Sequence, residues 1–244
     1  MLRMSYTIPG GAGAGGVAGE FVLITGEMND YISGLLDARR HSPRDDLLTR
    51  LLNAELEGER LSQSEILGFF QLLLLAGSET TSNLLSNAII SLCENAAAFA
   101  RLRQSPQTLI PSTIEEVLRY RSPVQWMFRV TREAVDLSGQ PIPAGAVVLA
   151  MIGSANRDPR QFANPEQFDI SRDPNPHIAF GHGAHFCLGS ALARLEGRVA
   201  MEEFLRSTDE VQLASELPWT PNPGLHVHGP TSLPIRFTPR DLTV

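Results

Sequence analysis

Apolar and polar residues alternate with a helical period over the first third of the chain. Between Glu27 and Arg40 the pattern is amphipathic and ends in basic residues, as the dipole of a helix favours. Pro43 interrupts it, because proline lacks the N–H that a helix interior needs. Asp45 and Asp46 then open a second predicted helix that continues to about Ala54.

The longest helical pattern runs from Ser62 to about Cys93 without a proline. Ser62 and Glu65 form a capping box at its start. Some 30 helical residues would span about 45 Å. The first half of this segment is apolar nearly all round, so we expect it to run through the interior. Two shorter helices are predicted over Ala96–Arg103 and Thr113–Tyr120.

The pattern changes after Pro123. Short strand-like runs appear at Phe128–Asp136 and Ala146–Ile152, separated by glycines and prolines. Residues 156–186 are rich in loop formers, residues 187–206 favour a last helix, and short strands follow. The expected fold is mainly α with small β-sheets, over a domain of residues 20–244. The Gly-rich residues 1–19 are expected to be a disordered leader.

Composition narrows the functional classes. The net charge of −7 argues against a nucleic-acid-binding protein, which would carry a basic patch. Two cysteines make no disulfide framework, so a reducing cytoplasm is expected. The longest apolar run, Ile66 to Ala76, is shorter than the roughly 20 residues that span a bilayer. No export signal is recognisable at the amino terminus, and no membrane association is expected.

The segment from Phe180 to Gly189 carries most of the candidate chemistry. Its glycines permit backbone shapes closed to other residues and let the backbone approach a ligand. Cys187 is expected at the start of a helix, where free N–H groups and the positive dipole end stabilise a thiolate. A thiolate beside an apolar phenylalanine is a suitable sulfur ligand for haem iron.

Other interpretations of Cys187 remain open at this stage. A lone cysteine is often an inert, buried small side chain. His182, His185 and Cys187 lie within six residues and could belong to a zinc site, although a second ligand pair is lacking. A cysteine nucleophile would need a base and an orienting partner.

Four ordered motifs resemble those of the cytochrome P-450 family. Phe180–Gly189 matches the cysteine-loop signature F-G-x-G-x-H-x-C-x-G. Ala76–Thr81 resembles the A-G-x-[DE]-T-T of the long central helix, and Glu116–Arg119 resembles E-x-x-R. Asn156–Pro159 with Phe162–Asp169 resembles the loop before the cysteine. The resemblance covers roughly residues 21–240 and implies the cytochrome P-450 fold with its amino-terminal half missing.

This resemblance implies a role for each matching residue. Cys187 is the axial ligand of the iron of haem b, and Arg129 and His185 contact the haem propionates. Glu79 and Thr80, on the central helix, relay protons. The remaining haem contacts are expected at Phe180, Gly181, Gly189, Ala76 and Gly77.

Glu116 and Arg119 are implied to form a structural pair, since positions i and i+3 share one face of a helix. The family often adds a third member, an arginine just before the phenylalanine of a P-x-R-F motif. Here that position is Gln167, while Arg172 lies close in sequence and could serve instead.

The implied activity is monooxygenation of a small hydrophobic organic substrate, with electrons from NAD(P)H. A ferredoxin- or flavodoxin-type donor and its reductase are the implied redox partners. The family's front half supplies a helix crossing the haem, further propionate ligands and the roof of the substrate pocket. A truncated, non-catalytic remnant, or a half-protein that needs a partner chain carrying that half, is therefore the alternative. A zinc-binding module is a more distant one.

Overall fold

The computed structural model describes residues 14–214 and 220–240, with side chains from residue 22 onward apart from Leu56. The chain divides between Ala76 and Gly77 into two compact units. Of the leader predicted over residues 1–19, residues 1–13 lie outside the described residues, and Ala14 already begins a helix.

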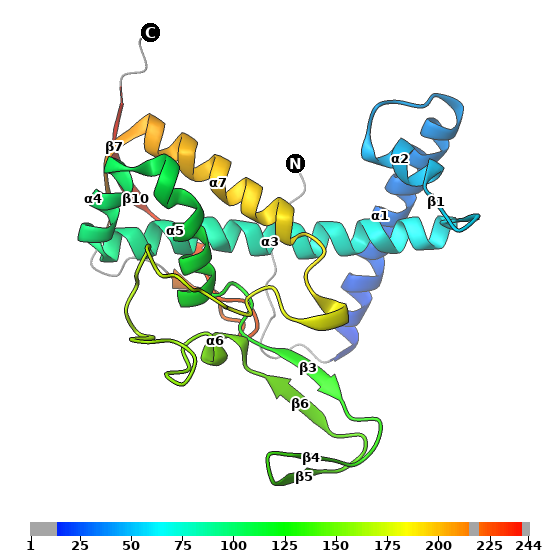
Figure 1. The fold of residues 1–244 in the computed structure, drawn as a ribbon. Coiled ribbons are helices and arrows are strands. Elements are labelled where there is room, and N and C mark those ends of the chain that lie inside the picture. Colours follow the sequence, from blue (N-terminus) through cyan, green and yellow to red (C-terminus); the bar gives the residue numbers. More distant parts are fainter. Residues whose placement is uncertain (1–13, 215–219, 241–244) are drawn as a thin grey trace. The chain divides into compact units, whose positions relative to one another are not determined.

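The first unit is built on two helices and a short hairpin (Figure 1). Its elements are α1 (Ala14–His41), α2 (Leu47–Asn53), β1 (Glu55–Leu56), β2 (Glu59–Arg60) and the beginning of α3 (Gln63–Glu94). The helix predicted from Glu27 is confirmed within α1, which begins further back. Ile32, Leu36 and Ile66 form the small buried core of the first unit.

Two helix starts follow from local hydrogen bonds that the sequence predicts. Asp46 caps α2 by accepting the N–H of Thr49 through its side chain at 2.9 Å. At α3, Ser62 and Glu65 exchange reciprocal bonds, with the Ser62 N–H donating to Glu65 Oε2 at 2.8 Å. Each bond satisfies a donor that the first helical turn leaves without a partner.

The prediction that the first half of α3 runs through the interior is wrong for its central leucines. Leu72, Leu74 and Leu75 are exposed by 60%, 46% and 40%. The second half is the buried one, with Leu84 and Leu92 on one face in the core of the second unit. Apolar composition permits burial on any face, but burial also needs a packing partner. Within the first unit, no described element covers the exposed leucines.

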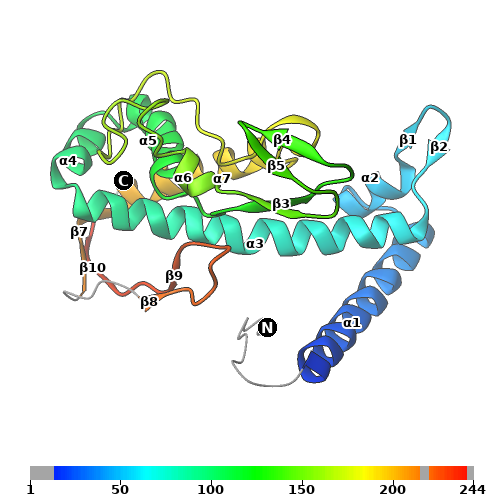
Figure 2. The same cartoon turned by 90° about the horizontal axis from the view of Figure 1, so that it is seen from below.

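The second unit packs helices around the later part of α3 (Figures 1 and 2). Its other helices are α4 (Ala96–Gln104), α5 (Pro106–Tyr120), the short α6 (Ile152–Ala155) and α7 (Ser190–Ser207). The helix predicted from Thr113 begins earlier, because Pro106 suits a first turn that needs no N–H partner. Gly197 of α7 lets Ile114 of α5 approach so closely that an added Cβ would lie 3.2 Å from it.

The strands of the second unit form two-stranded antiparallel pairs. They are β3 (Met127–Val130) with β6 (Val147–Ala150), β4 (Val135–Leu137) with β5 (Gln140–Ile142), β7 (Thr208–Leu213) with β10 (Ile235–Pro239), and β8 (Thr220–Pro221) with β9 (Pro230–Ser232). Ser138 and Gly139 turn the β4–β5 hairpin with φ of 54° and 83°. The predicted fold class, mainly α with small sheets, is confirmed. No described helix is both long and apolar enough to cross a membrane.

Candidate functional site: the cysteine loop and its supports

The cysteine loop is a compact turn that begins at Phe180. The Cys187 N–H donates to the Phe180 carbonyl at 2.9 Å and closes the loop on itself. Gly181 and Gly183 both have φ of 76°, a left-handed conformation that glycine adopts without strain. A single 3-10 turn, Gly183–His185, begins at the second of these glycines and precedes the cysteine. The glycine pattern of the sequence therefore predicts this backbone correctly.

Cys187 lies before α7 and not in its first turn. The helix begins at Ser190, whose N–H donates to the Cys187 carbonyl at 3.2 Å. The Cys187 sulfur lies near Gly189, the N-cap residue, where an added Cβ would be 4.0 Å from it. Within the described residues, no hydrogen bond reaches this sulfur, so the expected backbone donors do not hold it here.

The Cys187 thiol is free and exposed. The side chains on either side of it, Phe186 and Leu188, are apolar yet exposed by 49% and 80%. Exposed apolar side chains around one polar atom are typical of a surface that an apolar ligand or partner covers. Cys187 is therefore not the inert buried cysteine that was one alternative.

A charged cluster braces the loop from α5 and α7, and the sequence does not predict it. Glu115 accepts two hydrogen bonds from Arg194, at 2.7 and 2.9 Å, and a third contact from His177 Nε2 at 2.9 Å. The Arg194 guanidinium also lies 4.5 Å from the centre of the Phe180 ring. His177 and Arg194 lie 62 and 79 residues from Glu115 along the chain, so no local sequence pattern predicts these contacts.

The charges of this cluster support each other. Burial by itself raises the pKa of the Glu115 carboxyl, but the hydrogen bonds from His177 and Arg194 outweigh burial and hold the pKa at about 2. The hydrogen bonds to Glu115 in turn raise the pKa of the Arg194 guanidinium. Glu115 is thus a stable carboxylate in the pH range where proteins function.

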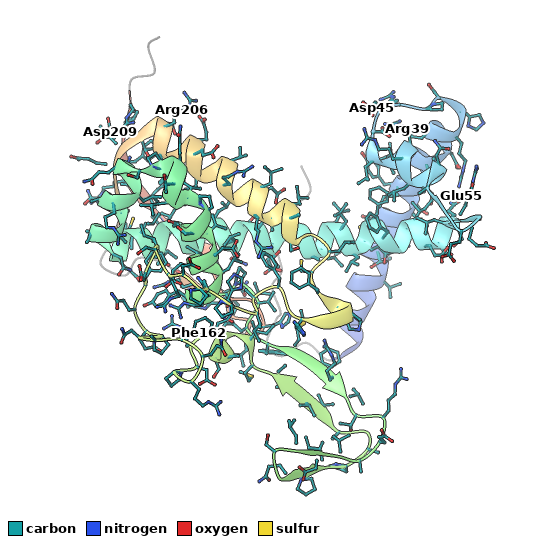
Figure 3. The ribbon with its side chains drawn as sticks, viewed as in Figure 1. Arg39, Asp45, Glu55, Phe162, Arg206 and Asp209 are labelled. Carbon is teal, nitrogen blue, oxygen red and sulfur yellow. The ribbon has the colours of Figure 1, made fainter. Side chains whose placement is uncertain are left out.

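Glu116 and Arg119 form a fully buried ion pair on α5, as the E-x-x-R resemblance implies. Arg119 donates twice to Glu116, both at 2.8 Å. Its other donors reach the backbone carbonyls of Asn156, Pro165 and Gln167 at 2.9, 2.8 and 3.0 Å. All five guanidinium donors are therefore used. Phe162, labelled in Figure 3, lies with its ring 5.3 Å from the guanidinium.

Arg172 occupies the place of the third member. Its Nε lies 3.2 Å from Glu116 Oε2, and its guanidinium also donates to the carbonyls of Ala163 and Gln167. Glu116 further accepts the Asp169 N–H at 2.8 Å. Gln167, which stands where the family often has arginine, contributes only its backbone carbonyl. The loop before the cysteine is thus tied to α5 through one carboxylate.

The acid and alcohol groups predicted to handle protons lie half-buried on α3, a continuous helix through this region. Glu79 Oε1 accepts a bond from Asn222 Nδ2 at 3.2 Å, and Thr80 is its neighbour. An added Cβ at Gly77 would meet nothing within 4 Å, so the backbone is open there. Ala76 belongs to the first unit.

Arg129 and His185 are both exposed. Arg129 lies on β3, and its guanidinium donates to the adjacent carbonyl of Phe128 at 2.8 Å. Neither residue is in an ion pair within the described part of the chain. The Arg129 guanidinium and the His185 imidazole are therefore both accessible to the carboxylates expected to bind them.

These residues fit haem in their chemistry. Haem needs a sulfur ligand for iron, apolar walls and groups that bind carboxylates. The loop offers an exposed thiol with apolar side chains beside it, and the exposed Arg129 and His185 side chains are of the chemical types that bind carboxylates. Among the described residues, no group of three or more His, Cys, Asp or Glu side chains is placed to hold a metal ion, so the zinc interpretation gains no support.

Comparison with known sequences identifies the family. The sequence model of the cytochrome P450 family matches residues 21–215. Cytochrome P450 107B1 of Saccharopolyspora erythraea is 44% identical over 213 residues, which cover 86% of this chain and 52% of the relative. Cytochrome P450 monooxygenase PikC of Streptomyces venezuelae is 43% identical over 86% of this chain and 51% of the relative. The chain spans about half the length of the curated relatives it matches.

Solved structures agree with this assignment. CYP109E1 from Bacillus megaterium in complex with testosterone has a TM-score of 0.86 and 42% identity, over 90% of this chain and 61% of that one. P450BioI in complex with an acyl carrier protein ligated to hexadec-9Z-enoic acid has a TM-score of 0.81 and 39% identity, over 87% and 54%. On its sequence, its fold and its cysteine loop, this chain belongs to the cytochrome P450 family.

Proposed function

We propose that the chain is the haem-binding part of a bacterial monooxygenase, with Cys187 as the axial ligand. One observation carries the proposal: a free, exposed thiol, beside apolar exposed side chains, projects from a loop that is closed by its own hydrogen bond. Haem b is the cofactor of the family, and when bound it supplies the activation of dioxygen and the transfer of one oxygen atom to substrate.

The chain's own residues then have separate tasks. Cys187 donates electron density to the iron through its sulfur. Arg129 and His185 would bind the propionate carboxylates and so orient the haem. Phe180, Gly181 and Gly189 of the cysteine loop would contact the haem, and Ala76 and Gly77 of α3 are proposed as further contacts.

Glu79 and Thr80 handle protons. The carboxyl of Glu79 can take up and release a proton, and the Thr80 hydroxyl can accept one proton while donating another. Asn222 fixes the carboxyl by donating to Oε1. Glu116 and Arg119 serve as the structural support described above.

Substrate and redox partners follow from the family. Relatives include a protein named methyl-branched lipid omega-hydroxylase, and CYP109E1 was solved with testosterone and with corticosterone. These molecules are largely apolar, and a small hydrophobic organic substrate is proposed here. A ferredoxin or flavodoxin with its reductase would deliver the electrons on the cysteine side.

A second candidate is a half-protein that forms the site only together with the other half of the fold. It is favoured by an apolar stripe on α7 formed by Leu192, Leu195 and Val199, which are exposed by 51%, 45% and 51%. Their spacing places them on one helix face. An exposed apolar helix face of this kind usually packs against another element or another chain.

The test is a reduced, carbon-monoxide difference spectrum of the purified chain supplied with haem. We expect a band typical of thiolate ligation that is lost in Cys187→Ala and kept in Cys93→Ala, the matched control at the other cysteine. A band that survives Cys187→Ala would sink the assignment of the ligand. Haem uptake only after co-expression with the amino-terminal half of a relative such as PikC would favour the second candidate.

A further inference from the structure

Arg194 joins the cysteine loop to the helix core at one point. It lies in the second turn of α7, and its guanidinium donates to both oxygens of Glu115 on α5. The flat face of the same guanidinium lies 4.5 Å from the centre of the Phe180 ring. A planar cation held edge-on by a carboxylate leaves its face free to stack on an aromatic ring.

Phe180 transmits this contact to the cysteine. Its ring meets Arg194, and its carbonyl accepts the N–H of Cys187 at 2.9 Å. Gly181 and Gly183, which lie between these two points, have no side chains with which to brace the backbone. Phe180 is thus the point where the loop meets both the Arg194 side chain and the backbone of Cys187.

His177 links Glu115 to the segment that leads directly into the loop. The Ala179 N–H donates to His177 Nδ1 at 3.2 Å, so Nδ1 is the acceptor and Nε2 carries the proton. Nε2 then donates to Glu115 Oε2 at 2.9 Å. The His177 side chain is only 3% exposed, which leaves the ring little freedom to swing away.

We propose that Arg194, held by Glu115, is a positioning residue for Cys187, acting through the ring and the carbonyl of Phe180. This inference rests on the proposed function, in which Cys187 ligates the haem iron. An ordinary surface ion pair would not position the cysteine loop in this way. Arg198, one turn further along α7, shows the contrast, since it only approaches Glu202 at 4.0 Å and both side chains are half exposed.

The experiment measures amide hydrogen exchange in the full chain without haem, by mass spectrometry of peptides covering residues 180–188. In Arg194→Met we expect exchange in this segment to quicken about tenfold, because the loop opens locally more often. Glu115→Gln, the milder variant, should act in the same direction. Arg198→Met is the matched control and should leave the loop unchanged. Unchanged exchange in the β7–β10 pair shows that each variant is folded.

Two results would overturn the proposal. One is wild-type protection of residues 180–188 in both Arg194→Met and Glu115→Gln. The other is an equal loosening of the loop in Arg198→Met. In the haem-supplied chain, Arg194→Met should lower the share of the thiolate-type band and shift the reduction potential. If the wild type itself lacks that band, the proposed function fails, whereas a normal wild type with an unaffected Arg194→Met refutes the positioning role alone.

Discussion

Replacing Arg119 by lysine tests how the loop before the cysteine is held. Lysine keeps the positive charge but has three donors on one nitrogen, where arginine has five in a planar fork. Arg119 uses all five, two on Glu116 and three on backbone carbonyls. Because both side chains are fully buried, water cannot replace the bonds that lysine fails to make.

The expected loss of stability follows from counting those bonds. At least two acceptors lose their donors, and each buried acceptor without a partner costs about 1–3 kcal/mol. Arg119→Lys should therefore lower the free energy of unfolding by roughly 2–6 kcal/mol, a large part of the 5–15 kcal/mol typical of folded domains. Arg172 remains beside Glu116 and limits the loss, since the carboxylate keeps one cation.

The assay is urea unfolding followed by tryptophan fluorescence. Trp126 belongs to the second unit, so its signal reports on the unit that contains Arg119. Arg206→Lys is the matched control, because Arg206 pairs with Glu203 at the same i, i+3 spacing on the exposed side of α7 (Figure 3). The control should show no measurable change, as expected for a solvated pair.

The midpoint in urea should fall in Arg119→Lys while the slope of the transition stays the same. A midpoint as little changed as that of Arg206→Lys would refute the reasoning, since it would mean that the carbonyls around Arg119 find other partners at no cost.

Three further predictions concern other features. A neutral alkylating reagent should label Cys187 at least ten times faster than Cys93, since burial raises the pKa of the Cys93 thiol and lowers its access, and equal rates would contradict the exposed loop. The lowered pKa of Glu115 contributes stability that is fully present above its unfolded-state value near 4.5 and is lost as pH falls toward about 2. Glu115→Gln should therefore flatten the decline of unfolding free energy in that interval, and a parallel decline would exclude the effect. Leu192→Ser with Leu195→Ser should reduce self-association measured by sedimentation without lowering the thermal midpoint, whereas a lower midpoint would show that these side chains are internally packed.

Local signals in the sequence determined much of the framework. Ser62 with Glu65 and Asp46 mark helix starts because their side chains bond amides three residues away, within reach along the chain. Glycine between Phe180 and Cys187 predicted the left-handed turns for the same local reason. The i, i+3 spacing placed Glu116 and Arg119 on one helix face, whereas only the family resemblance implied that the pair is buried and structural.

Tertiary structure alone decided which groups meet across the fold. Arg172, rather than the residue at position 167, completes the support of Glu116, because the turn after Phe168 carries its guanidinium back to α5. Glu115, His177 and Arg194 come together over separations of 62 and 79 residues, where periodicity holds no information. The exposed leucines of α3 and α7 also show that packing decides burial. A helical pattern states which residues can be buried, and only the packing of other elements against them decides which ones are.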